Sequence, residues 1–173
     1  MIKLYFLLIF NIIIFHTNLF AEEKIFYLDV NFLLSESEAG KYINNELQLI
    51  NNKNIEEFKK IENSIKTEEE KLLKQKNILK EEEFNNKVNK LREKYKSYQE
   101  LKNKKNNDLK ILRDKAGNQI LKIINEILAE YSTKNKISLI MKKENLVIGK
   151  TELDITKNIF DLLNAKIKKV ELN

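Results

Sequence analysis

Eight basic side chains crowd one stretch of the chain, and the chemistry they offer is that of a positively charged surface. Only two carboxylates, Glu93 and Glu100, lie among them. Such a surface attracts acidic or unfolded polypeptides, or anionic lipid, by electrostatic steering. A solvated helix face that keeps a long helix soluble explains the same residues equally well. The eight are Lys87, Lys90, Arg92, Lys94, Lys96, Lys102, Lys104 and Lys105.

The residue types that enzymes use for covalent or acid–base chemistry are scarce. The chain of 173 residues contains no cysteine and one histidine, His16. It also lacks a glycine-rich phosphate loop and a nucleophile-elbow motif. Its carboxylates lie on the expected helix faces next to lysines, as they do on solvated surfaces. We therefore expect no enzyme activity, no metal and no cofactor.

The first 21 residues have the pattern of a signal peptide. Lys3 precedes an apolar run, Leu4–Phe15, and Ala21 ends a candidate cleavage site. The run is short for a membrane span, which needs roughly 20 apolar residues, although an uncleaved anchor is the alternative. Cleavage removes His16, and the loss of Lys3 lowers the formal net charge from +6 to +5.

Export limits the expected partners. No cysteine follows the apolar run, so the sequence excludes a lipoprotein anchor. We expect a periplasmic protein for which acidic polypeptides or an anionic membrane surface are partners, and nucleic acid is not.

Long helices must position the basic stretch. Between Ser35 and Tyr131 the chain has no proline, and apolar residues recur at every third or fourth position. The pattern predicts two helices, the first of them capped by Ser35 or Ser37. They form an arm over residues 35–134 with its tip near residues 77–83.

Two arrangements of these helices are open. A turn near Lys80 gives an antiparallel hairpin, whereas one unbroken helix would be about 145 Å long and would separate the two ends of the chain. We favour the hairpin, in which the first helix runs past Asn77 and Leu72 faces Val88. Its apolar seam is predicted to contain Phe58, Ile61, Ile65, Leu72, Phe84, Val88, Leu91, Tyr95 and Tyr98.

Two glycines come level at the foot of this hairpin. Gly40 lies beside Ala39, and Gly117 lies beside Ala116. Small residues let two helices approach closely, and glycine lowers local helix stability by about 1 kcal/mol. The two glycines are hinge candidates for the arm, and a tight packing point without motion is the equal alternative.

Short β-like segments flank the arm. The first strand, Lys24–Val30, precedes it, and a hairpin of two strands, Ile137–Met141 and Asn145–Ile148, follows it. Three short strands leave exposed edges and little core, so we expect oligomerisation. The residues expected in this oligomerisation base are Ile25, Tyr27, Leu139, Met141 and Val147.

The predicted fold class is α+β and mostly α: a long antiparallel helical hairpin on a small β-stranded base. Residues 22–34 and residues 135–173 form the base. The second of these segments ends in an amphipathic helix that Asp154 or Thr156 caps.

The two ends and the tip of the chain resemble the Skp/OmpH family of periplasmic chaperones. Asn31–Gly40 is similar to the segment that leads from the family's first strand into its long helix. Ser138–Met141, Asn145–Ile148 and Leu153–Thr156 are similar to its closing strands and the turn into its last helix. Asn77–Phe84 is similar to the tip of many members. Position 80 departs from the family, because Lys80 stands where a capping serine is common.

The resemblance implies a homotrimer in which three bases assemble into a small barrel and three arms surround a cavity. It also implies ATP-independent holding of unfolded outer-membrane proteins, and the basic arm residues would contact these clients. The alternative is a structural coiled-coil protein that spaces the cell envelope, for which a β base has no evident use.

Overall fold

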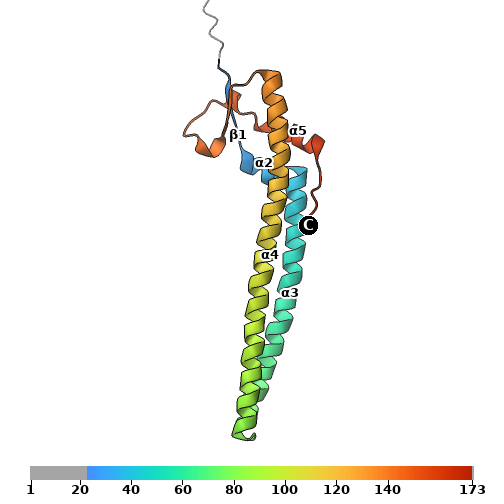
Figure 1. The fold of residues 1–173 in the computed structure, drawn as a ribbon, viewed down its shortest axis with the longest axis vertical. Helices are drawn as coiled ribbons and strands as arrows, with labels where there is room; N and C mark the ends of the chain where they lie inside the picture. Colours follow the sequence, from blue (N-terminus) through green and yellow to red (C-terminus); the bar gives the residue numbers. More distant parts are fainter. Residues whose placement is uncertain (1–22, 173) are drawn as a thin grey trace, which may run out of the picture.

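The computed structural model describes residues 23–172, so the predicted signal peptide lies outside the described residues. Figure 1 shows two long helices that run side by side away from a small base, where the strands and the shorter helices gather. The elements in chain order are β1 (Ile25–Leu28), α2 (Val30–Glu36), α3 (Glu38–Gln75), α4 (Glu81–Asn135), β2 (Leu139–Lys142), the 3₁₀ turns η1 (Lys143–Asn145) and η2 (Thr151–Leu153), and α5 (Thr156–Lys166).

The helical hairpin is confirmed. Helix α3 has 38 residues and α4 has 55, which corresponds to about 57 Å and 82 Å of helix. The extra length carries α4 past the start of α3 and into the base (Figure 1). Helix α3 ends at Gln75 and does not run past Asn77. It stops there because the Ile78 and Leu79 amides both donate to the Gln75 carbonyl at 3.0 Å and close a tight turn.

Side-chain caps decide where the first two helices begin. The Asp29 carboxylate accepts the Phe32 amide at 2.9 Å, so α2 starts at Val30, and the first strand ends at Leu28 instead of Val30. The buried Ser37 hydroxyl accepts the Gly40 amide at 3.1 Å and starts α3, as predicted. Both are the standard capping geometry of a short polar side chain.

The predicted strand hairpin after the arm is wrong. Strand β2 pairs with β1 and runs parallel to it, with Ile25 opposite Leu139 and Leu28 opposite Lys142. The next residues form η1, and in the described chain residues 145–148 belong to no strand. The reason is the route of the chain. Helix α4 returns it to the far side of the base, so β2 runs in the same direction as β1, and the arm is the long crossover that parallel pairing needs.

The core lies where the base meets the foot of the arm. Its buried side chains come from β1 and from helices α2, α3, α4 and α5, and the predicted apolar face of the last helix contributes two of them. The N-cap position of α5 is Ile155, which makes no side-chain cap, so neither Asp154 nor Thr156 caps this helix as predicted. Asp154 accepts the Thr156 amide at 2.9 Å just before the helix. The most deeply buried large residues are Leu33, Ile120, Ile124, Ile159 and Leu163.

Candidate functional site

The eight basic residues divide into two groups along α4. Four of them are half-buried and hold the hairpin together, chiefly through acids and amides of α3. Lys105 Nζ lies 3.1 Å from Glu57, and Lys94 pairs with Glu68. The other two inward contacts are Lys102 with Glu62 at 4.0 Å and Lys87 with Gln75 at 3.2 Å.

The remaining four basic residues are exposed. Lys104 pairs with Asp108 one turn along the same helix at 3.6 Å. Lys90, Arg92 and Lys96 make no ion pair with any residue of the described range 23–172. Lys87 also lies 3.4 Å from Glu83 on α4, so five of the eight cations are paired with carboxylates, three of them across the arm. The unpaired positive charge of this stretch is therefore smaller than the count of eight suggests.

The seam between α3 and α4 is thin. Phe58, Leu72 and Tyr98 are its buried members below the core, whereas Tyr95 is 54% exposed at its edge. The other predicted seam residues are half-buried, namely Ile61, Ile65, Phe84, Val88 and Leu91.

An aromatic and polar cluster forms the part of this seam at mid-arm. The Tyr98 ring meets Phe58 edge-on with ring centroids 6.1 Å apart, and its hydroxyl donates a short hydrogen bond to Glu62. Lys102 Nζ lies over both rings, 5.7 Å from the Tyr98 centroid and 5.9 Å from the Phe58 centroid. Tyr95 completes the cluster at 6.5 Å from Tyr98. These contacts fix the register of the two helices because each spans the hairpin or borders a residue that does.

Two pKa shifts follow from the cross-arm contacts. The hydrogen bond from Lys94 lowers the pKa of Glu68 below its usual 4.5, since it favours the charged carboxylate. The hydrogen bond to Glu62, followed by burial, raises the pKa of Tyr98 above its usual 10.0 because both favour the neutral phenol.

The predicted oligomerisation residues have very different exposures. Tyr27 is buried, with its hydroxyl donating to the Lys150 carbonyl at 3.2 Å, and Met141 is half-buried. Ile25 and Leu139 face each other in register and are 42% and 49% exposed. Val147 is fully exposed, as is its neighbour Ile148 at 90%. The sheet and the following loop thus each present two large apolar side chains to solvent.

A charged network holds the loop that carries these two residues. Lys143 Nζ lies 3.8 Å from both Asp29 and Asp154, so one ammonium bridges the carboxylate that caps α2 and the carboxylate that precedes α5. The Thr156 hydroxyl accepts the Asp29 amide at 2.8 Å. Asn31 adds a 3.4 Å hydrogen bond to Glu144. The start of the loop is therefore tied to the end of β1.

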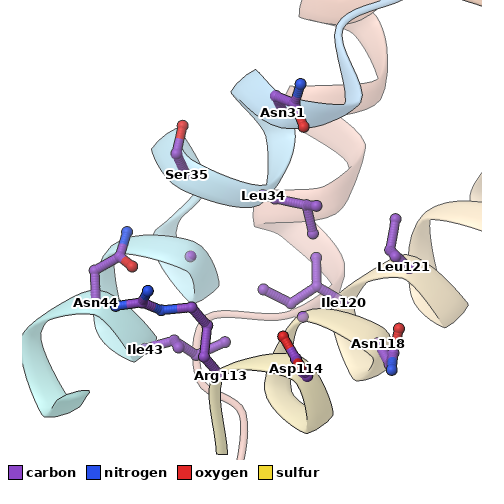
Figure 2. A pocket seen from close by; sticks show the side chains of 12 residues that line it. Asn31, Leu34, Ser35, Ile43, Asn44, Arg113, Asp114, Asn118, Ile120 and Leu121 are labelled. Carbon is purple, nitrogen blue, oxygen red and sulfur yellow. The ribbon is translucent and has the colours of Figure 1, made fainter. Parts of the chain in front are cut away.

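The foot of the arm holds a cavity of about 550 Å³ between α2, α3 and α4 (Figure 2). Both hinge candidates line it, but they differ sharply. A Cβ atom at Gly40 would lie 2.1 Å from the Leu34 carbonyl oxygen, so α2 packs directly on this glycine. A Cβ atom at Gly117 would meet no described atom within 4 Å. The close approach of α2 explains why residue 40 is a glycine, whereas no close approach explains the glycine at position 117.

Within residues 23–172, no group of three or more His, Asp or Glu side chains is placed to hold a metal ion. In the same range, no helix is both long and apolar enough to cross a membrane.

The sequence matches the model of the family described as "Outer membrane protein (OmpH-like)" over residues 24–163. The chain belongs to the OmpH-like family. The match spans β1, the whole arm, β2 and most of α5.

The OmpH-like fold is also found in a crystal structure from Caulobacter crescentus, described as a candidate OmpH-like outer membrane chaperone. The two chains superpose with a TM-score of 0.79 at 16% identity, over 87% of this chain and 89% of the other. No curated protein sequence matches this chain significantly.

Some residues of this OmpH-like chain were not found from sequence. Glu62 and Glu68 are not predicted as cross-arm partners, although their distance from the tip matches that of Tyr98 and Lys94. Lys143 gives no sequence signal, because the acids it bridges come from distant segments.

Proposed function

We propose that this OmpH-like protein is an ATP-independent periplasmic holdase chaperone, without enzyme activity, that binds unfolded outer-membrane proteins between its arms. The observation that carries the proposal is an arm whose own lysines and acids hold it together while Lys90, Arg92 and Lys96 stay exposed. Such an arm remains extended without a partner and presents free positive charge to one. The description of the Caulobacter crescentus protein as a candidate chaperone supports the same role.

The proposed assembly is a homotrimer. Two paired strands are marginally stable alone, and large exposed apolar side chains mark interaction surfaces. Ile25 and Leu139 on the two-stranded sheet, and Val147 and Ile148 in the loop that follows β2, are such side chains. A cavity of about 600 Å³ between that sheet and α4 has a mainly apolar lining and opens beside it. Packing three bases through these features buries them and places three arms around a shared space.

Client binding is expected to be weak at each contact and multivalent overall. Exposed charges are screened beyond about 8 Å at physiological ionic strength, so each Lys or Arg contributes little alone. Three arms around one unfolded chain raise the effective concentration of each contact. Added salt should therefore weaken client binding more than it weakens the arm, whose seam is partly apolar.

The tip offers a second surface. Leu73 and Ile78 are 64% and 80% exposed there, beside Lys76 and Lys80. Apolar side chains flanked by lysines suit the surface of an anionic membrane, which we include as a proposed contact.

The test is protection of a client from aggregation. A urea-unfolded outer-membrane β-barrel protein is diluted into buffer without nucleotide, with and without the mature chain. The proposal predicts that the client stays soluble near one trimer per client and that salt reduces the effect. An unrelated coiled-coil protein of similar length serves as the control. Equal aggregation in the two samples would favour the envelope spacer instead.

A further inference from the structure

A stripe of hydrogen-bond donors runs along one face of α4, beside the hairpin seam. Its members follow one another in steps of four and three residues, which places them on one side of a helix. Every member ends in an amide, an ammonium or a guanidinium group, and none carries a carboxylate. The donor stripe consists of Arg92, Lys96, Gln99, Asn103, Asn106, Lys110 and Arg113.

The donor stripe is open to solvent and its charges are unpaired. All of its members are exposed except Gln99, which is half-buried. Its four cations form no ion pair with residues 23–172, in contrast to Lys94 and Lys105 on the inner side of the same helix. Tyr95, which is 54% exposed, borders the stripe and adds an aromatic surface.

At its upper end the donor stripe enters a groove between α4 and α3. A cavity of about 410 Å³ is lined there by Asn106, Lys110 and Arg113, and by amides of α3. It adjoins the cavity at the foot of the arm, because Asn44 and Arg113 line both. Figure 2 shows Arg113 extending from α4 toward Asn44 on α3. Asp114 is the single carboxylate among the residues that line the two cavities.

We propose that the donor stripe and this groove form one binding track for an extended, acidic segment of unfolded polypeptide. This inference rests on the proposed function and specifies which face of the arm holds the client. Asn and Gln side chains both donate and accept hydrogen bonds, as the peptide group does. An unfolded chain has free peptide groups to offer, whereas a folded protein has paired nearly all of its own. The four cations bind client carboxylates.

The track also has a defined length. Arg92 and Arg113 are separated by 21 residues of one helix, which is about 32 Å. An extended chain rises about 3.3 Å per residue, so about ten client residues fill the track. A lipid headgroup is a poorer fit, because Lys110 lies about 45 Å of helix away from the start of α4 at the tip. A flat membrane reaches the tip before it reaches this position.

The test compares two double variants of the mature full-length protein. Lys110→Gln/Arg113→Gln removes two cations from the track. Lys59→Gln/Lys60→Gln removes two exposed cations of α3 that line neither cavity, with the same change in net charge. The probe is a fluorescent, unstructured peptide of Asp, Ser and Gly, made in several lengths, and binding is measured by anisotropy. Removing the two track cations should weaken binding about three- to tenfold, against less than about 1.5-fold in the control.

Two further readouts support the proposal if they agree. Asn44→Ala changes no charge and should weaken binding about twofold through loss of an amide. Affinity should rise with peptide length up to about ten residues and then level off.

Other outcomes would contradict the proposed binding track. Equal weakening in both double variants would show that peptide binding depends on net charge alone. Unchanged binding in both would show that the track does not bind the peptide. Loss of binding to anionic phospholipid vesicles, with peptide binding intact, would assign the cations to lipid. If the wild-type chain protects its client and Lys110→Gln/Arg113→Gln protects equally well, only the track fails. If the wild-type chain does not protect the client, the proposed function fails as well.

Discussion

Single side chains carry much of the pairing between the two long helices, because the seam buries few residues outside the core. At mid-arm, Phe58 and Tyr98 are 8% and 4% exposed, and the next buried apolar residue toward the tip is Leu72. The cluster around Tyr98 therefore fixes both the separation and the register of α3 and α4 at this height. A substitution in this cluster should weaken the pairing of α3 and α4 along the arm, because no broad core lies beside it in the described chain.

Tyr98→Phe removes the hydroxyl that donates to Glu62 and keeps the ring against Phe58. We expect a loss of about 1–2 kcal/mol in the free energy of unfolding, since the lost hydrogen bond has a charged acceptor. The matched control is Tyr95→Phe, whose ring is 54% exposed, and it should change stability by less than about 0.5 kcal/mol. Urea unfolding followed by circular dichroism measures both. Equal losses would show that the Tyr98 hydroxyl has no special role.

The two shifted groups predict opposite pH dependences. The folded pKa of Tyr98 is raised, so its contribution is complete below the usual 10.0 and is lost as the pH rises through the folded pKa. The folded pKa of Glu68 is lowered, so its contribution is present above 4.5 and is lost as the pH falls through the folded pKa.

The Glu68 effect should be small, because its side chain is 51% exposed and its pair with Lys94 is screened by solvent. We expect Glu68→Gln to cost at most about 1 kcal/mol at neutral pH, and less in high salt. Unfolding of wild type and variant across the acid range measures the difference. A gap between the two that persists at pH values below the folded pKa would contradict the assignment. Glu69→Gln on the same helix is the control.

At the scale of elements, two glycines at the same height on neighbouring helices have different surroundings. Gly40→Ala would force a Cβ atom against the Leu34 carbonyl, so α2 must move, and we expect a loss of more than about 2 kcal/mol. Gly117→Ala meets open space inside a helix and should stabilise the arm by about 0.5–1 kcal/mol. Thermal unfolding of the two variants compares them directly. Destabilisation by Gly117→Ala would mean that a neighbouring chain occupies that space.

The elements that the sequence predicts well are those with a repeating signal. Helix periodicity and the Ser37 cap locate the arm. No Pro or Gly marks a turn near Lys80, but the apolar positions of the two helices match across that point and so predict a hairpin. The pairing of the strand segments is harder to predict. A segment of five to seven mostly apolar residues suits a strand in either direction, so the parallel pairing of β1 and β2 depends on where α4 delivers the chain.

The basic stretch shows how far the candidate site can be predicted from sequence alone. Residue type alone does not separate Lys94, which pairs across the arm, from Lys96, which faces solvent. That distinction needs the position of α3 around α4. The spacing of the donor stripe is present in the sequence, but its polar residues do not stand out until Asn44 of α3 is placed beside Arg113.

At the scale of the whole molecule, the base is the part that a single chain leaves incomplete. Val147→Asp places a carboxylate at a fully exposed apolar position in the proposed trimer contact, and burying it there is costly. We expect this variant to dissociate into folded monomers. Ile78→Asp, at a position 80% exposed on the tip, is the control and should keep the mass of the wild type. Sedimentation of the two variants measures the result, and trimers of Val147→Asp would place the contact elsewhere.

The most direct measurement is the mass of the mature protein in solution, by light scattering, with and without an unfolded outer-membrane β-barrel protein. We predict three chains in the free protein and a complex that takes up the client at a fixed ratio, without nucleotide. A dimer, a filament or a monomer that leaves the client to aggregate would contradict it.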